Sequence, residues 1–239
     1  MTDTQVKPPK RTRTKKADRA SVSSFVSPLI SLLYPLARHV VLPAYFGNID
    51  VSGSEWVPRE GATILAPTHR SRWDPVLLSY STGRPVSGRD VRFMTSINEM
   101  RGFQGCLVRR LGAFPIDPSR PGIGSLRHGL ELLLAGEMLA IFPEGGIFHE
   151  NKIKPFKPGM GRLAMQAASQ APDLNLKIIP VAIRYDRLPQ RWGCDVNIGI
   201  GKPIFANDYD LDSVKKSAKQ LTADLHEALQ DLYDRSAHN

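Results

Sequence analysis

Residues 62–75 have the sequence ATILAPTHRSRWDP, which is typical of a strand, a short turn and a helix in succession. The apolar run 62–66 predicts a buried strand, and Pro67 halts it. Pro75 is favoured in the first turn of a helix, and aspartate is favoured as the cap before it. The stretch therefore predicts that Asp74 caps a helix and that the polar residues before it lie in a turn at the tip of the strand.

The turn contains a histidine and an aspartate, His69 and Asp74, five positions apart. On one continuous helix such residues lie about 500° apart and face different sides, so they meet only if His69 lies in the turn. An imidazole held by a carboxylate is fixed in one tautomer and becomes more basic, so its other nitrogen can take a proton from a hydroxyl. The pair is a candidate general base with its orienting group; the alternative is a structural histidine beside a helix cap.

A second polar cluster follows the apolar run 138–142, which also predicts a strand. The turn formed by Pro143, Glu144, Gly145 and Gly146 comes next, and its glycines permit close approach of the backbone to a ligand. A plain turn with a solvent-exposed glutamate is the alternative. The presence of both polar strand ends in one chain favours a functional site.

From residue 48 onward, short β-branched runs alternate with helical patterns, which predicts an α/β domain with a mixed sheet flanked by helices. The predicted strands are 62–66, 91–95, 112–116, 138–142, 177–184 and 195–200. The predicted helices are 75–82, 99–110, 123–135, 159–171 and 212–234. A length of 239 residues suits one sizeable core. We therefore predict three segments: a disordered basic tail at 1–20, an apolar helical segment at 21–46 and a single domain at 47–239.

The chain has a formal charge of +9, and the excess lies mostly at its start. Residues 1–20 hold seven cations against two acidic residues and lack apolar periodicity, which predicts disorder. Attraction to anionic lipid or nucleic acid is one interpretation of this tail, and a solvated tail without a specific role is the other.

Cys106 and Cys194 lie far apart, with no further cysteine or histidine at metal-ligand spacing. This spacing argues against a disulfide framework or a zinc site and favours a reducing cytosol.

The segment 21–46 is apolar but interrupted. In its uncharged part, residues 20–37, five serines and two prolines weaken a spanning helix, since such a helix needs about 20 predominantly apolar residues. The pattern favours a proline-broken helix that lies in a membrane interface. A helix packed on the protein's own core is one alternative, and a signal peptide is another, although no persuasive small-residue cleavage site follows.

Four sequence blocks between residues 50 and 205 resemble those of the lysophospholipid acyltransferase superfamily, which includes 1-acylglycerol-3-phosphate O-acyltransferases. The family's first block, Asn-His-x-Ser-x-x-Asp, is matched at 68–74, with Thr68 in place of the asparagine. Its third block, Phe-Pro-Glu-Gly-Thr-Arg-Ser, is matched at 142–145 and then lost. The Phe-Lys-x-Gly block corresponds to 156–159, and the hydrophobic-Pro-Val block to 179–181.

The chain departs from the family where the acceptor's phosphate is expected to bind. The second family block, Gly-x-x-x-Ile-Asp-Arg, is similar to residues 112–118, but Pro118 replaces its arginine, and Ile147 replaces the arginine of the third block. In the family these arginines are taken to hold the phosphate, since arginine forks are the usual phosphate clamps. Nearby cations are candidates to replace them: Arg70, Arg72, Arg120 and Lys157. A surface-exposed Arg120 without a ligand role is the alternative.

The resemblance implies transfer of a fatty acyl group from acyl-CoA or acyl carrier protein to a lysophospholipid-type acceptor such as 1-acylglycerol-3-phosphate, on the cytosolic side of a membrane and without a metal or cofactor. We assign His69 and Asp74 to catalysis. The substrate-binding assignments are Ser71, Arg72, Arg120, Glu144, Gly145, Gly146 and Lys157. The chain has no Gly-x-Ser-x-Gly nucleophile motif, which favours direct transfer without a covalent acyl-enzyme.

One other acceptor and two other function classes remain open. A phosphate-free lipid alcohol as acceptor would explain the missing arginines. A lipid ester or thioester hydrolase would use the same base to activate water. A binding protein without catalysis would explain the basic tail, and nucleic acid is its least favoured ligand, because the core lacks aromatic-interleaved basic strands.

Overall fold

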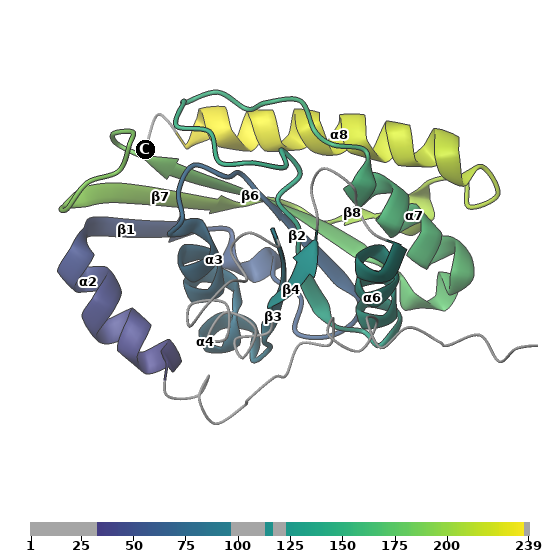
Figure 1. The fold of residues 1–239 in the computed structure, drawn as a ribbon, viewed down its shortest axis with the longest axis horizontal. Helices are drawn as coiled ribbons and strands as arrows, with labels where there is room; N and C mark the ends of the chain where they lie inside the picture. The colour runs from purple at the N-terminus through teal and green to yellow at the C-terminus, as the bar shows by residue number, and fades with distance from the viewer. Residues whose placement is uncertain (1–32, 97–112, 117–122, 237–239) are drawn as a thin grey trace, which may run out of the picture.

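The protein, seen in a computed structural model, is described here over residues 33–96, 113–116 and 123–236. These residues form a sheet of eight strands in the order β1-β7-β6-β2-β5-β3-β4, with β8 paired to β6 (Figure 1). The strands are β1 (Phe46–Ser52), β2 (Thr63–Pro67), β3 (Val91–Ser96), β4 (Ala113–Ile116), β5 (Met138–Ala140), β6 (Lys177–Tyr185), β7 (Cys194–Ile200) and β8 (Ile204–Phe205).

Helices cover both faces of this sheet, as the α/β prediction requires. The α-helices are α2 (Leu42–Tyr45), α3 (Asp74–Thr82), α4 (Arg84–Ser87), α6 (Ile123–Leu134), α7 (Gly159–Gln170) and α8 (Val214–Arg235). Short helical turns of other types are η2 (Ala37–Val41), η3 (Ser54–Trp56), η5 (Pro172–Leu174) and η6 (Ala206–Asp208). In Figure 1, α8 lies above the sheet, α7 lies at its right-hand end, and α2 and α3 lie below it.

The two largest hydrophobic clusters, one on each face of the sheet, follow from the alternation of side chains along each strand. Ile64 on β2 packs with α6, α7 and α8, whereas the adjacent Leu65 packs with α2 and α3 on the opposite face. The sheet is mixed, because β6 pairs antiparallel with β7 and β8 while the other pairings are parallel. The predicted mixed sheet flanked by helices is therefore confirmed.

Helical residues 33–36 continue through η2 into α2, and we call residues 33–45 the N-terminal helix. Its side chain Leu42 is fully buried in the core, and Phe46 just beyond it is 3% exposed, so the helix is packed on the domain. Within the described residues, no helix has both the length and the apolar character needed to cross a bilayer. The predicted tail at 1–20 and the first part of the segment 21–46 lie outside the described residues.

Most predicted elements match the observed ones to within about two residues at each end. The strand predicted at 138–142 is shorter and ends at Ala140. Strands β1 and β8 and the short helix α4 were not predicted. The sequence of β1 contains glycine, asparagine and aspartate, which are depleted in strands, and this strand lies at the sheet edge with an irregular burial pattern. The helix predicted at 99–110 lies outside the described residues.

The pairing of β2 with β5 places the two polar turns side by side. The strands run parallel, with Thr63 opposite Met138 and Leu65 opposite Ala140. The carboxyl ends of parallel neighbours meet at the same edge of a sheet, which is where open α/β sheets bind ligands. The turn after β2 and the turn after β5 therefore form one site.

Candidate active site

The first feature of the site is the predicted contact between His69 and Asp74. Nδ1 of His69 lies 2.9 Å from Oδ2 of Asp74, and the side chains are 16% and 0% exposed. When Nδ1 carries the proton and donates it to the carboxylate, Nε2 is left as a proton acceptor. The imidazole also stacks on the ring of Phe142, with ring centroids 3.9 Å apart and an interplanar angle of 24°. Phe142 therefore holds one face of the imidazole ring, and Asp74 holds its Nδ1 atom.

The carboxylate of Asp74 is fixed by the turn before it and by a distant strand. Oδ2 accepts hydrogen bonds from the backbone N–H groups of Arg70 (2.6 Å) and Ser71 (2.8 Å) as well as contacting His69. Oδ1 accepts a 2.6 Å hydrogen bond from the hydroxyl of Tyr185 on β6. Burial, reinforced by the neighbouring Asp74 charge, raises the pKa of Tyr185 far above its usual value, so the phenol remains a donor.

The prediction that Asp74 caps α3 is wrong. The helix begins at Asp74 itself, its N-cap residue is Trp73, and no side chain caps it. The carboxylate oxygens point instead to donors of the preceding turn and of β6. The aspartate therefore stabilises the turn that carries the histidine.

A buried ion pair joins the two polar turns. Nη1 of Arg70 lies 2.8 Å from Oε1 and 3.0 Å from Oε2 of Glu144, and both side chains are fully buried. The same carboxylate accepts hydrogen bonds from the backbone N–H of His69 (3.1 Å) and of Lys154 (2.9 Å). Arg70 is consequently enclosed by protein and is excluded as a replacement for the missing phosphate-binding arginines. Glu144 holds the His69 turn against the loop that follows β5.

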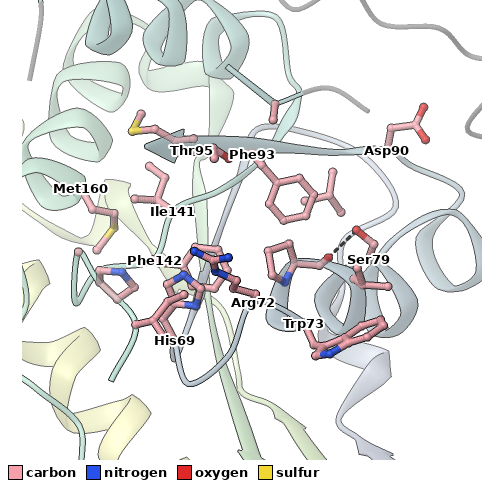
Figure 2. Close-up of a pocket in the computed structure, with 18 of the residues that line it drawn as sticks. His69, Arg72, Trp73, Ser79, Asp90, Phe93, Thr95, Ile141, Phe142 and Met160 are labelled. Carbon is pink, nitrogen blue, oxygen red and sulfur yellow. Dashed lines mark hydrogen bonds between the residues drawn. The ribbon is translucent and has the colours of Figure 1, made fainter. Parts of the chain in front are cut away.

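A cavity of about 1330 Å³ opens beside the histidine. Its described lining comes mainly from the N-terminal helix, α3, β3, the loop that follows β5 and the start of α7, and it is mainly apolar. His69, Arg72 and Phe142 gather in one part of its wall, with Ile141 and Phe93 nearby (Figure 2). The residues of the two turns therefore face one large compartment.

The predicted substrate-binding residues divide into two groups. Those that line the cavity are Arg72, Gly145, Gly146 and Lys157. Ser71 and Glu144 are buried behind its wall, and Ser71 contributes its backbone N–H to Asp74 and its hydroxyl oxygen to the N–H of Trp73. Arg120 lies outside the described residues.

Gly145 has a specific conformational role at the cavity wall. Its φ of 75° favours glycine, and a Cβ atom there would lie 2.9 Å from Cγ of Lys157. The absence of a side chain thus lets the aliphatic part of Lys157 lie across the turn. Ile147, which occupies the position of a family arginine, also lines the cavity and makes that part of the wall apolar.

Three features of the site were missed by sequence reasoning. Tyr185 lies in an apolar strand pattern 111 residues from Asp74, and no motif marks it. Arg38 on the N-terminal helix and Arg162 on α7 add cations to the cavity wall. Arg162 follows Lys157 by five positions and lies in the first turn of the predicted helix 159–171. This position was the sequence signal that could have marked it as a candidate for the site. Among the described residues, no group of His, Cys, Asp and Glu side chains could hold a metal ion.

Comparison with known proteins identifies the family. The family model Acyltransferase matches residues 48–184. The 1-acyl-sn-glycerol-3-phosphate acyltransferase of Bacillus subtilis is 23% identical over 79% of this chain and 90% of that protein. The protein of the same name from Streptococcus pneumoniae is 27% identical over 71% of this chain and 59% of that protein.

The fold is also found in a solved structure. The crystal structure of the 1-acyl-sn-glycerophosphate acyltransferase from Thermotoga maritima matches 85% of this chain and 80% of that chain, with a TM-score of 0.58 and 18% identity. At that identity the match concerns the fold alone. Because the family model covers more than half of the sequence, the chain belongs to the acyltransferase family.

Proposed function

We propose that this acyltransferase moves a fatty acyl group from acyl-CoA or acyl carrier protein to the hydroxyl of a lysophospholipid-type acceptor, with 1-acylglycerol-3-phosphate as the first candidate, in phospholipid synthesis. The names of the Bacillus and Streptococcus relatives support this acceptor class. The observation that carries the proposal is the buried Asp74 that orients His69 at the wall of a large apolar cavity. Its volume of about 1330 Å³ exceeds the roughly 300–1,000 Å³ of ordinary ligand pockets, which suits two lipid substrates bound together.

In the proposed reaction, Nε2 of His69 takes the proton of the acceptor hydroxyl while the hydroxyl oxygen attacks the thioester carbonyl carbon. A carbon–oxygen bond forms, and the tetrahedral intermediate then breaks its carbon–sulfur bond. The departing thiolate takes the proton back from the imidazolium. Asp74 holds the ring in the reactive tautomer and stabilises the imidazolium during the step.

Cations that line the cavity are suited to hold the acceptor's phosphate. We place Lys157 and Arg162 in this role, together with Arg72, because all three line the same compartment as His69. The aliphatic part of Lys157 lies against Gly145 in the turn that follows β5. Arg120 remains a further candidate from the sequence.

A phosphate-free lipid alcohol is the second candidate acceptor, and one observation favours it. Ile147 presents an apolar side chain to the cavity at the position of a phosphate-binding arginine in the family. An acceptor without a phosphate would need no cation there. The two candidates differ in one measurable property, which is whether a phosphate on the acceptor improves turnover.

We also propose that the protein acts at the cytoplasmic side of a membrane, attached peripherally or monotopically. Its lipid substrates and the seven cations of residues 1–20 support attachment to an anionic surface. Leu42 is part of the core, so a truncation that tests the tail should stop at residue 20 and leave the N-terminal helix intact. Such a truncation should weaken binding to anionic vesicles and reduce its salt dependence, because exposed charges are screened over about 10 Å at 0.1 M salt.

The decisive experiment for the reaction incubates purified protein with acyl-CoA or acyl carrier protein donors of several chain lengths and with matched phosphate-bearing and phosphate-free lysolipids. Mass analysis of the products identifies donor and acceptor together. An acylated lysophospholipid supports the first candidate, and an acylated phosphate-free lipid supports the second. Release of free fatty acid with every acceptor would show a hydrolase and would refute the proposal.

A further inference from the structure

Tyr233, in the last turn of α8, packs behind the two polar turns of the active site. Its side chain is buried in a small hydrophobic cluster with Leu229, Ala182 and Ile153. Ala182 lies on β6, and Ile153 lies in the segment 148–154 between β5 and α7, which we name the site loop. In Figure 1, the chain that leads from β5 to α7 runs along α8. The cluster therefore joins the end of α8 to β6 and to the site loop.

The ring of Tyr233 contacts two guanidinium groups. Its centroid lies 5.4 Å from Cζ of Arg70 and 5.0 Å from Cζ of Arg184. A cation within about 6 Å of an aromatic ring is attracted to it, and the attraction is stronger where water is excluded. The contact with Arg70 is of the stronger kind, because both side chains are buried. Arg184 also donates a 3.5 Å hydrogen bond to the backbone carbonyl of Tyr233, which fixes the end of the helix to β6.

Arg70 has one nitrogen that its hydrogen bonds do not use. Nη1 contacts the carboxylate of Glu144 and the carbonyl of His69, and Nη2 donates a 3.1 Å hydrogen bond to the carbonyl of Lys152. Nε is buried and has no hydrogen-bond partner among the residues that the structure describes. The ring of Tyr233 thus adds an attraction to a buried cation whose hydrogen bonding is incomplete.

The hydroxyl of Tyr233 makes a second link, to the site loop. It donates a 3.1 Å hydrogen bond to Oδ1 of Asn151. The next residue in the loop is Lys152, whose carbonyl accepts the hydrogen bond from Arg70. Tyr233 therefore holds both partners of that hydrogen bond, the arginine through its ring and the loop through its hydroxyl.

Two further contacts connect the site loop to the backbone of His69. The N–H of Phe148 donates a 2.9 Å hydrogen bond to the His69 carbonyl. The carboxylate of Glu144 accepts hydrogen bonds from the N–H of His69 and from that of Lys154. A shift of Arg70 or of the loop should therefore move the imidazole relative to a bound hydroxyl.

We propose that Tyr233 is a positioning residue for acyl transfer, because it holds Arg70 and the site loop in the arrangement that fixes His69. The proposal rests on the proposed function of His69 as the base. Tyr233 does not line the cavity, so its loss should lower turnover and leave substrate binding nearly unchanged. Lys157, which does line the cavity, is fixed separately, because its N–H donates a 2.8 Å hydrogen bond to the carbonyl of Pro143.

The first test compares substitutions in the full-length protein by steady-state acyl transfer, at a temperature where urea unfolding shows each variant to be folded. Tyr233→Leu removes the ring and the hydroxyl and should lower kcat about tenfold to a hundredfold, the scale of a misplacement of about 1 Å, with KM changed less than about twofold. Tyr233→Phe keeps the ring and should lower kcat only about twofold to fivefold.

The matched control is Leu225→Ala, which removes another buried side chain of α8. Leu225 lies eight positions before Tyr233, or about 12 Å along the helix, and packs in the cluster around Ile64. This variant should lose stability but keep the kcat of the wild type. Asn151→Ala, at an exposed residue, should repeat the effect of Tyr233→Phe, and the double variant should be no slower than either single variant. These last two substitutions remove one hydrogen bond each and keep the test decisive if Tyr233→Leu does not fold.

A second measurement does not depend on activity. Protein labelled with ¹⁵N-histidine contains six labelled residues, and the backbone amide signal of His69 is identified by its loss in His69→Ala. Tyr233→Leu should shift this signal, and Leu225→Ala should not. Wild-type kcat in folded Tyr233→Leu, an equal loss of kcat in Leu225→Ala, or additive effects of Tyr233→Phe and Asn151→Ala would each overturn the proposal. Normal turnover in His69→Ala would refute the proposed function but leave the expected shift of the His69 signal, so the two failures are distinguishable.

Discussion

Replacing Glu144 with alanine should destabilise the protein strongly while changing the apparent affinity for substrate little. In the structure, this carboxylate does not line the cavity and is enclosed with Arg70, whose side chain is fully buried. The substitution removes the two carboxylate acceptors of Arg70 Nη1 and leaves that atom only the carbonyl of His69. It also removes the acceptor of the His69 and Lys154 backbone N–H groups. The substitution should therefore affect catalysis only by changing the position of His69.

The size of the stability loss depends on the groups that the substitution leaves without a partner. Breaking a buried ion pair by removing one partner costs about 3–5 kcal/mol, because an uncompensated charge remains in the interior. Each backbone N–H that loses its acceptor adds about 1–3 kcal/mol where water cannot reach it, and such terms are not simply additive. A loss of at least about 3 kcal/mol is therefore expected, which is a large part of the roughly 5–15 kcal/mol that stabilises a typical protein.

The assay is urea unfolding followed by circular dichroism, combined with steady-state kinetics at low temperature, where the variant remains folded. The double variant Arg70→Met with Glu144→Leu removes both charges and should recover much of the stability. It should not recover turnover, because the N–H of His69 still lacks its acceptor. Wild-type stability in Glu144→Ala, together with a raised KM, would refute this reasoning and return Glu144 to substrate binding.

Three further predictions concern Tyr185, the buried tyrosines and Arg120. Tyr185→Phe should lower stability by about 1.5–3 kcal/mol and lower kcat with little change in KM, since the lost hydroxyl bonds to Asp74 and Ser71 and does not line the cavity; a raised KM with normal kcat would contradict this. Burial raises the pKa of Tyr34, Tyr185 and Tyr209 in the folded protein above the value of about 10 in the unfolded chain. Their contribution to stability is therefore complete below about pH 10 and is lost as the pH rises through their pKa values in the folded protein. Absorbance titration should therefore show fewer ionised tyrosines at about pH 11 in native than in denatured protein, and equal numbers would contradict it. Arg120→Ala should raise the apparent KM for lysophosphatidic acid about tenfold to a hundredfold and leave the donor KM unchanged; equal kinetics would remove Arg120 from the site.

The sequence predicted the location of the site, because polar residues directly after two apolar strands must lie at the carboxyl ends of those strands. The contact between His69 and Asp74 followed from their spacing, which allows them to meet only in a turn. The same spacing did not determine which donors the carboxylate would accept. Asp74 therefore bonds to the turn before it, although it was predicted to cap the helix after it.

The parts that could not be predicted depend on contacts between distant segments. From the sequence, Arg70 is expected to be a surface cation. It pairs with Glu144 because the turns after β2 and β5 lie next to each other in the fold. In the sequence Tyr185 is part of an apolar strand pattern and belongs to no motif. The pairing of β2 with β6 nevertheless places it beside Asp74. The edge strand β1 was missed because its polar residues face solvent and weaken the strand pattern.

Acyl transfer by the His69→Ala variant is the measurement that tests the account most directly. The wild type and the variant are compared with the donor and acceptor that the wild type uses best, after circular dichroism shows that both are folded. General-base assistance is worth roughly 10²–10⁴ in rate, so turnover should fall by at least about a hundredfold while the variant remains folded. Turnover near that of the wild type in folded His69→Ala protein would contradict the assignment of His69 as the catalytic base.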